Sequence, residues 1–282
     1  MRNRGIKRLA ILLTIGVLAL VSVGCSNKKN SSEDNNLDKK ELTIGVSPGP
    51  YNVLFNDAIQ PILEKEGYTI KEIEFSDLLQ SEIALTEGSV DFNVAQHTSY
   101  AENYNKEKNG DLTPIVHIPT VPAGIFSENN KSLDSVKEGS KVAIPKDPSN
   151  AARAFKLLEK AGWIKTKEGS DKASLTLNDI EENIYGIEII EMESSQIPRV
   201  IEDLDFGILP GSVVYLANMD PEKSLLSEDV SENLELVVVV SEKNKDSNWA
   251  KAIVDAYKSD EFKAYMEEHN KNNYRYIPEE LR

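Results

Sequence analysis

The residues best suited to hold a small molecule lie in one stretch of the sequence, 141–163, which reads KVAIPKDPSNAARAFKLLEKAGW. A short apolar run at 142–144 stops at a proline, and Asp-Pro-Ser-Asn follows at 147–150. These residues supply N-cap side chains and a proline suited to the first helical position, so a helix is expected to begin there. Helical periodicity places Asn150 and Arg153 on neighbouring parts of one face, near the helix start.

This arrangement favours the binding of an anion. The first turn of a helix has free backbone N–H groups and the positive end of the helix dipole, and both attract negative charge. A guanidinium one turn further on adds two parallel N–H donors that match a carboxylate. The pattern therefore predicts a site for a small carboxylic acid at Arg153. The alternative is that Arg153 only pairs with one of the many acidic residues of the surface, and composition alone leaves this open.

The N-terminal segment has the layout of a signal peptide. Four basic residues precede an uncharged apolar stretch at 9–23, and Gly24 and Cys25 follow it. The stretch has about 15 residues, fewer than the roughly 17 to 25 that span a bilayer as a helix. The pattern is typical of a bacterial lipoprotein leader at 1–24, with an acylated Cys25 as the mature N-terminus. Ser22 stands where leucine is commonest, and an uncleaved membrane anchor is the alternative.

Composition limits the classes of function. Cys25 is the only cysteine, so the chain forms no internal disulfide and no cysteine-based metal site. Loss of the leader takes away four basic residues and no acidic one, which lowers the formal net charge from −15 to −19. So acidic a chain is not expected to bind nucleic acid. The polar residues that follow the leader, 25–40, predict a flexible tether.

From residue 41 onward, predicted strands and helices alternate, which indicates an α/β fold with parallel sheet. An extended segment at 113–126 is broken by two prolines. We expect two α/β lobes, one formed by 41–120 with 235–282 and the other by 121–234, with a ligand cleft between them. The expected strands are 42–46, 69–75, 90–94, 142–144, 187–192, 206–209 and 234–240. The expected helices start after 50, 78, 100, 147, 196 and 212, and a long one covers 249–268.

No catalytic or metal-binding pattern is evident. The three histidines show no HExxH or i, i+4 pairing, and there is no phosphate-binding glycine loop and no GxSxG motif. The sequence therefore predicts no catalytic residue, no cofactor and no metal site. The loops at the carboxyl ends of the strands are expected to face the cleft. They are 47–50, 96–97, 145–150 and 210–211.

Four blocks of the sequence follow one another in a recognisable order: VSPGP at 46–50, VDFNVAQH at 90–97, IPKDPSNAARAFKLLEKAG at 144–162 and SQIPRVIEDLDFGILPG at 195–211. Together they resemble the NlpA/MetQ family. Its members are lipoprotein substrate-binding components of methionine ABC importers. The resemblance extends from about residue 42 to the C-terminus. It implies the two-lobed type II periplasmic-binding-protein fold, an amino acid such as methionine as ligand, and a permease with its ATPase as partners. It also implies a lipid-anchored position on the extracytoplasmic side of the cell membrane.

The resemblance also implies which residues bind the ligand. Arg153 matches the arginine that holds the amino acid's carboxylate in this family, and Asn150 matches the asparagine one turn before it. Gln96 and His97 match a glutamine-histidine pair beside the pocket.

Three departures from the family pattern leave the ligand open. Val94 and Ala95 stand where the family usually has tyrosine and phenylalanine. The segment Pro-Thr-Val-Pro at 119–122 replaces His-x-Glu-Pro, and Pro210 replaces an asparagine that binds the ligand's amino and carboxylate groups. Proline has no side-chain donor or acceptor and no backbone N–H. The candidates to rebuild the site are Tyr51, Ser212, Glu193 and Gln196, although the last two can equally be ordinary surface residues.

Three functions remain. The first is an importer's solute-binding lipoprotein for methionine or a related amino-acid-like compound. The second is an extracytoplasmic enzyme on the same fold, for which no acid/base pair or activated nucleophile is evident. The third is a surface or sensing lipoprotein that has kept the fold, changed its ligand and lost transport.

Overall fold

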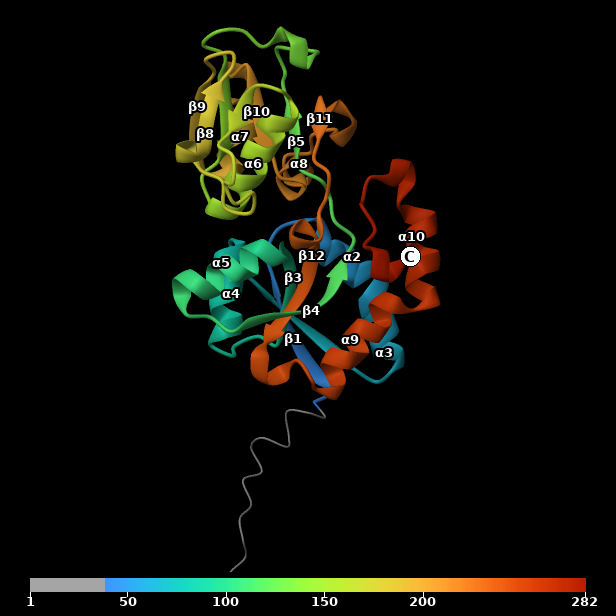
Figure 1. Ribbon diagram of the computed structural model, residues 1–282. Helices are drawn as coiled ribbons and strands as arrows, with labels where there is room; N and C mark the ends of the chain where they lie inside the picture. The colour runs from blue at the N-terminus through green and yellow to red at the C-terminus, as the bar shows by residue number, and fades with distance from the viewer. Residues whose placement is uncertain (1–38) are drawn as a thin grey trace, which may run out of the picture.

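A computed structural model describes residues 39–282 of the chain. The predicted leader, the acylation site at Cys25 and all but the last two residues of the tether lie outside this range. Two lobes, each built on a five-stranded sheet, lie one above the other and are joined by two crossing segments (Figure 1). The predicted fold, mixed α/β with two lobes, is therefore confirmed. Within residues 39–282, no helix has the length and apolar character needed to cross a bilayer.

The first lobe contains the sheet β2-β1-β3-β12-β4. Its strands are β1 (Glu41–Val46), β2 (Thr69–Glu74), β3 (Phe92–His97), β4 (Leu112–Ile118) and β12 (Leu236–Ser241). Its helices are α2 (Pro50–Leu54), α3 (Gln60–Lys65), α4 (Leu78–Thr86), α5 (Thr98–Lys108), α9 (Asn248–Lys258) and α10 (Asp260–His269). A π-helical turn, Phe55–Ile59, joins α2 to α3. The apolar residues of this segment that share one face are all buried, namely Phe55, Ala58, Ile59, Ile62 and Leu63.

The second lobe contains the sheet β11-β5-β10-β6-β9. Its strands are β5 (Gly124–Phe126), β6 (Lys141–Pro145), β9 (Glu188–Met192), β10 (Phe206–Leu209) and β11 (Leu226–Ser227). Its helices are α6 (Pro148–Lys160), α7 (Ile197–Val200) and α8 (Gly211–Leu216), and a small sheet pairs β7 (Ile164–Thr166) with β8 (Ile180–Asn183). The core gathers around Phe155, Trp163 and Phe206, and the rings of the last two lie 4.6 Å apart.

The expected parallel pairing is present in both sheets, β1 with β2 and β3 and β6 with β9 and β10, but each sheet also contains antiparallel strands. The strands β5 and β12 are antiparallel to their neighbours. Each comes directly after a crossing segment, so each enters its sheet at the edge where the parallel strands end. Accordingly, Leu236 at the start of β12 lies opposite His97 at the end of β3, and Gly124 at the start of β5 lies opposite Leu209. A strand that begins at the cleft edge must run against strands that finish there.

Two helix predictions also need correction. The long helix expected at 249–268 is two helices, because Ser259 has an extended backbone (φ −70°, ψ 153°) and caps α10 by accepting the N–H of Phe262. The helix expected at 196–204 is the four-residue α7 flanked by 3-10 turns. Val200 (φ −117°, ψ 8°) departs from helical geometry and ends the α-helix there, whereas Pro198 lies in the first turn, where a proline is tolerated.

Two crossing segments connect the lobes, the first at 119–123 and the second at 228–235. The first crossing segment touches the start of α8 very closely. A Cβ added to Gly211 would lie 2.2 Å from Cγ1 of Val121 and 2.7 Å from its carbonyl oxygen. Val121 packs in the core of the first lobe, whereas Gly211 belongs to the second. A glycine at this position therefore allows the two lobes to meet.

Candidate functional site

Helix α6 begins as its sequence predicts. Asp147 is the N-cap, and its Oδ1 accepts the backbone N–H of Asn150 at 3.0 Å, with Pro148 at the first helical position. The expected apolar face, from Ala151 to Leu158, is buried in the second lobe. This anchoring fixes the position of Arg153, whose residue exposure is 4% although it carries a charge.

The guanidinium of Arg153 is paired with the carboxylate of Glu228. Nε of Arg153 donates to Oε2 of Glu228 at 3.0 Å, Nη2 donates to Oε1, and Nη1 donates to Oδ1 of Asn150 at 2.8 Å. The two charged side chains are 5% and 6% exposed. Burial alone would lower the pKa of Arg153, but the attraction and hydrogen bonds of Glu228 raise it. Arg153 is therefore paired with an acidic residue, as in the alternative interpretation of the sequence. That residue is buried, however, whereas the alternative interpretation expected one on the surface.

Glu228 is the functional candidate that the sequence did not reveal. It is the first residue of the second crossing segment, and its Oε1 accepts the backbone N–H of Ala123 in the first crossing segment at 2.8 Å. Its own N–H donates to the carbonyl of Ala123 at 2.9 Å. One carboxylate thus links both crossing segments to α6. In the sequence Glu228 is one of 47 acidic residues and belongs to no motif that would single it out.

His97 presents a hydrogen-bond donor that has no protein partner. As the N-cap of α5, its Nδ1 accepts the N–H of Tyr100 at 3.2 Å, so in the neutral ring the proton is on Nε2. Burial, and then the charge of Arg153, keep the pKa of His97 well below its usual value, although the nearby side chain of Asn150 acts in the opposite direction. Among the described residues, no acceptor meets Nε2 with hydrogen-bond geometry. Because a buried donor without an acceptor is costly, Nε2 is suited to a ligand oxygen.

Gln96 also has an unused donor. Its Oε1 accepts the N–H of Ala95 at 3.2 Å, and its Nε2 is buried without a partner in the described part of the chain.

The other candidates lie in different places. Tyr51 is buried in the first lobe and its hydroxyl accepts the N–H of Val121 at 3.2 Å. Burial raises the pKa of Tyr51 to about 12. The positive charge of Arg153 acts in the opposite direction, so the Tyr51 hydroxyl lies near enough to Arg153 for the two groups to interact electrostatically. Ser212 is half-buried at the start of α8, where Gly49 of the first lobe approaches it. Glu193 is exposed and paired with Lys146 at 2.6 Å, as its surface interpretation predicts.

The positions that depart from the family pattern do not rebuild the missing contacts. Val94 is fully buried in the core of the first lobe, and Pro210 caps the start of α8 without a side-chain hydrogen bond. Val121 offers only an apolar side chain, packed in that same core. The structure therefore brings Arg153 into direct contact with Asn150 and with the carboxylate of Glu228. His97 and Tyr51 lie close enough to interact electrostatically with Arg153.

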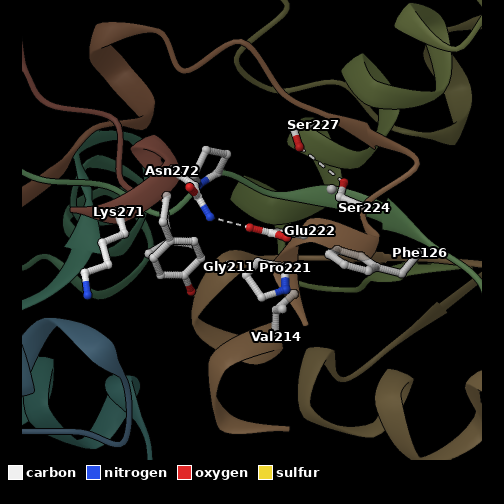
Figure 2. A pocket seen from close by; sticks show the side chains of 13 residues that line it. Phe126, Gly211, Val214, Pro221, Glu222, Ser224, Ser227, Lys271 and Asn272 are labelled. Carbon is white, nitrogen blue, oxygen red and sulfur yellow. Dashed lines mark hydrogen bonds between the residues drawn. The ribbon is translucent and has the colours of Figure 1, made fainter. Parts of the chain in front are cut away.

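Two cavities of about 350 Å³ each lie near the crossing segments. Neither is lined by Arg153, but Glu228 lines the second. Figure 2 shows the first, where Phe126, Val214 and Pro221 of the second lobe face the C-terminal segment. In this cavity Nδ2 of Asn272 donates to Oε1 of Glu222 at 2.6 Å and so connects the two lobes. In the part of the chain that the structure describes, no group of three His, Cys, Asp or Glu side chains is placed to hold a metal.

Glu82 in α4 is a buried carboxyl group outside the site. It is 0% exposed and neither oxygen has a partner in the described residues. Burial raises its pKa to about 8 from an ordinary value of 4.5. Between these two pH values the folded protein holds a proton that the unfolded chain releases, so stability falls as the pH rises from about 4.5 and stops falling above about 8.

We therefore expect Glu82→Gln to remove this pH dependence. At pH 7 the variant's free energy of unfolding should exceed the parent's by roughly 3 kcal/mol, at 1.36 kcal/mol per pKa unit. Thermal unfolding at pH 5 and pH 8 measures the effect, with Glu87→Gln, an exposed residue just after the same helix, as the control. Equal pH dependence in the parent and Glu82→Gln would contradict this prediction.

Comparison with known proteins adds independent information. The family model described as NlpA lipoprotein matches residues 42–279. The D-methionine-binding lipoprotein MetQ of Salmonella typhi is 32% identical over 255 residues, which is 89% of this chain and 90% of that protein.

Solved structures agree with this result. A lipoprotein from Ruminococcus gnavus superposes with a TM-score of 0.76 at 35% identity, covering 82% of this chain and 96% of that one. A nutrient-binding protein from Burkholderia cenocepacia, solved with bound methionine, gives a TM-score of 0.77 at 32% identity, covering 84% and 99%. The resemblance noted in the sequence is confirmed.

Proposed function

The chain belongs to the NlpA lipoprotein family, and from this premise we propose that it is a lipid-anchored, extracytoplasmic solute-binding protein. It delivers methionine or a closely related amino acid to an ABC importer. Its relatives support this function, since one is named for D-methionine binding and a neighbouring structure contains methionine. A membrane permease, and through it an ATPase, are the partners that such an importer requires.

One observation carries the proposal, the position of Arg153 in the second turn of α6 at the boundary of the two lobes. A guanidinium held rigidly by Glu228 and Asn150, with the unused donor of His97 in electrostatic range, is suited to a carboxylate. In residues 39–282 no group of three His, Cys, Asp or Glu side chains is placed to hold a metal beside it.

The test is direct. Small molecules released by denaturing the purified protein are identified by mass spectrometry, and the refolded protein is titrated calorimetrically with L-methionine and the other standard amino acids. We expect saturable binding of at least one amino acid to one site. Absence of binding to all of them by correctly refolded protein would contradict the proposed function.

The anchor is a separate proposal, which rests on the four basic residues, the apolar stretch and the Gly24-Cys25 junction. We expect Cys25→Ala to lose lipidation and to leave the membrane fraction almost completely, because no thiol remains to carry the acyl chain. Membrane fractionation with immunoblotting measures this, and Ser26→Ala is the neighbouring control. If Cys25→Ala were processed and retained like the parent, the lipoprotein leader would be disproved.

A further inference from the structure

We propose that residues 270–276, here called the C-terminal strap, hold the two lobes closed over the ligand through a hydrogen bond from Asn272 to Glu222. The strap belongs to the first lobe and Glu222 to the second, so this bond forms only when the lobes are together. Both residues line the first cavity, which Arg153 does not line, and they therefore act on binding by positioning the lobes. The inference rests on the proposed function and adds two positioning residues outside the candidate site.

The C-terminal strap is fixed to the first lobe and to the first crossing segment. It begins directly after α10, and the side chain of Asn270 closes it into a loop. Nδ2 of Asn270 donates to the carbonyl of Arg275, and Oδ1 of Asn270 accepts the N–H of Arg275, both at 2.8 Å. Tyr276 then exchanges two backbone hydrogen bonds with Thr120, at 2.8 and 2.9 Å. These bonds hold the two ends of the loop and leave its tip, at Asn272, facing the second lobe (Figure 2).

Asn272 is suited to the tip of this loop. Its backbone is left-handed (φ 57°, ψ 21°), a conformation that asparagine adopts more readily than most residues. Its Nδ2 donates to Oε1 of Glu222 at 2.6 Å, and this hydrogen bond is charge-assisted because the acceptor is a carboxylate. The strap therefore presents a donor to the second lobe at a fixed place.

The C-terminal strap meets the second lobe without packing tightly against it. The cavity of about 350 Å³ lies between Tyr274 of the strap and Phe126 and Val214 of the second lobe (Figure 2). Asn272 and Glu222 are both exposed, so their bond can break and re-form without uncovering the core of either lobe. Lobes joined by a small polar contact can separate to admit a ligand.

A second hydrogen bond joins the lobes beside the candidate site. Nδ2 of Asn103 in α5 donates to Oγ of Ser149, in the first turn of α6, at 3.1 Å. In Figure 1 α5 and the C-terminal strap lie on opposite sides of the crossing segments. One bond alone would allow the lobes to rotate about it, whereas two bonds on opposite sides restrict that rotation. The strap thus supplies one of two contacts that fix α6, and Arg153 with it, against the first lobe.

The C-terminal strap is expected to slow the release of the ligand. A hydrogen bond that exists only in the closed arrangement raises the population of that arrangement, and a ligand leaves from the open one. Loss of the bond therefore increases the dissociation rate and leaves the association rate nearly unchanged. The expected change is only a few-fold, because an exposed donor and acceptor exchange their partners for water at little cost.

The experiment replaces the donor of the strap with a second acceptor. Asn272→Asp keeps a side chain that tolerates a left-handed backbone but places two carboxylates against each other. Stopped-flow measurements use L-methionine, or the standard amino acid that binds the parent most tightly, and should show it leaving this variant at least about 5-fold faster. In the double variant Asn272→Asp/Glu222→Gln an amide again faces a carboxylate, so the rate should return to within about 2-fold of the parent. A merely structural role of Asn272 would not be rescued by this change at Glu222.

The control is Asn109→Asp, which makes the same change at an exposed asparagine with a left-handed backbone (φ 53°) at the end of α5. It should leave the dissociation rate unchanged. An Asn272→Asp variant that releases the ligand as slowly as the parent, or a double variant that releases it as fast as Asn272→Asp, would overturn the inference while leaving the amino acid site in place. A parent that binds no standard amino acid would overturn the proposed function and this inference together.

Discussion

Arg153→Ala is expected to weaken the binding of an amino acid by about 30- to 1,000-fold, because it removes a charge-assisted two-point contact worth roughly 2 to 4 kcal/mol in a desolvated site. It should also lower the free energy of unfolding by about 3 to 5 kcal/mol, because Glu228 is left buried without its partner. Calorimetric titration measures the first effect and chemical denaturation the second.

The control for Arg153 is Arg199→Ala, which removes an exposed arginine from α7 in the same lobe and should change neither quantity. An Arg153→Ala variant that loses stability but binds the amino acid as tightly as the parent would show that the arginine is only structural. The ligand would then have to bind elsewhere.

Gly211→Ala is expected to have the second largest effect. The added methyl group would lie 2.2 Å from Cγ1 and 2.7 Å from the carbonyl oxygen of Val121, and a backbone atom cannot move aside as a side-chain end can. The contact joins α8 of the second lobe to the core of the first, so the methyl group should force the lobes apart. We expect a loss of stability of about 1 to 3 kcal/mol, as for other overpacked sites, and at least about 10-fold weaker binding.

Small-angle scattering of the Gly211→Ala variant with saturating ligand should show a larger radius of gyration than the parent under the same conditions. The control change Leu216→Ala, at a residue of the same helix that is 48% exposed, should leave scattering and affinity unchanged. Parent-like scattering and affinity in Gly211→Ala would mean that this close approach does not determine how the lobes meet.

The local features of the site could be predicted from the sequence because their causes are local. Asp147 caps α6, Pro148 occupies its first position, and Arg153 follows one turn later, all of which depend on residues within one short stretch. The buried faces of the helices followed from their periodicity in the same way. The family blocks then indicated the two-lobed fold.

The rest could not be predicted because it depends on contacts between distant residues. Arg153 and Glu228 are 75 positions apart, and no local pattern shows which of the many carboxylates meets the guanidinium. The antiparallel direction of β5 and β12 follows from where the chain crosses between lobes, which hydrophobic periodicity does not encode. Val94 appeared only as a departure from the family's aromatic residue, whereas in the structure it fills the core of the first lobe.

The most direct test of the account is a crystal structure of the protein grown with L-methionine or with the amino acid found to co-purify. The account predicts the ligand between the lobes, with its carboxylate about 2.7 to 3.0 Å from Nη1 and Nη2 of Arg153. An amino acid found instead in the cavity lined by Phe126 and Tyr274, with the Arg153–Glu228 pair untouched, would contradict it.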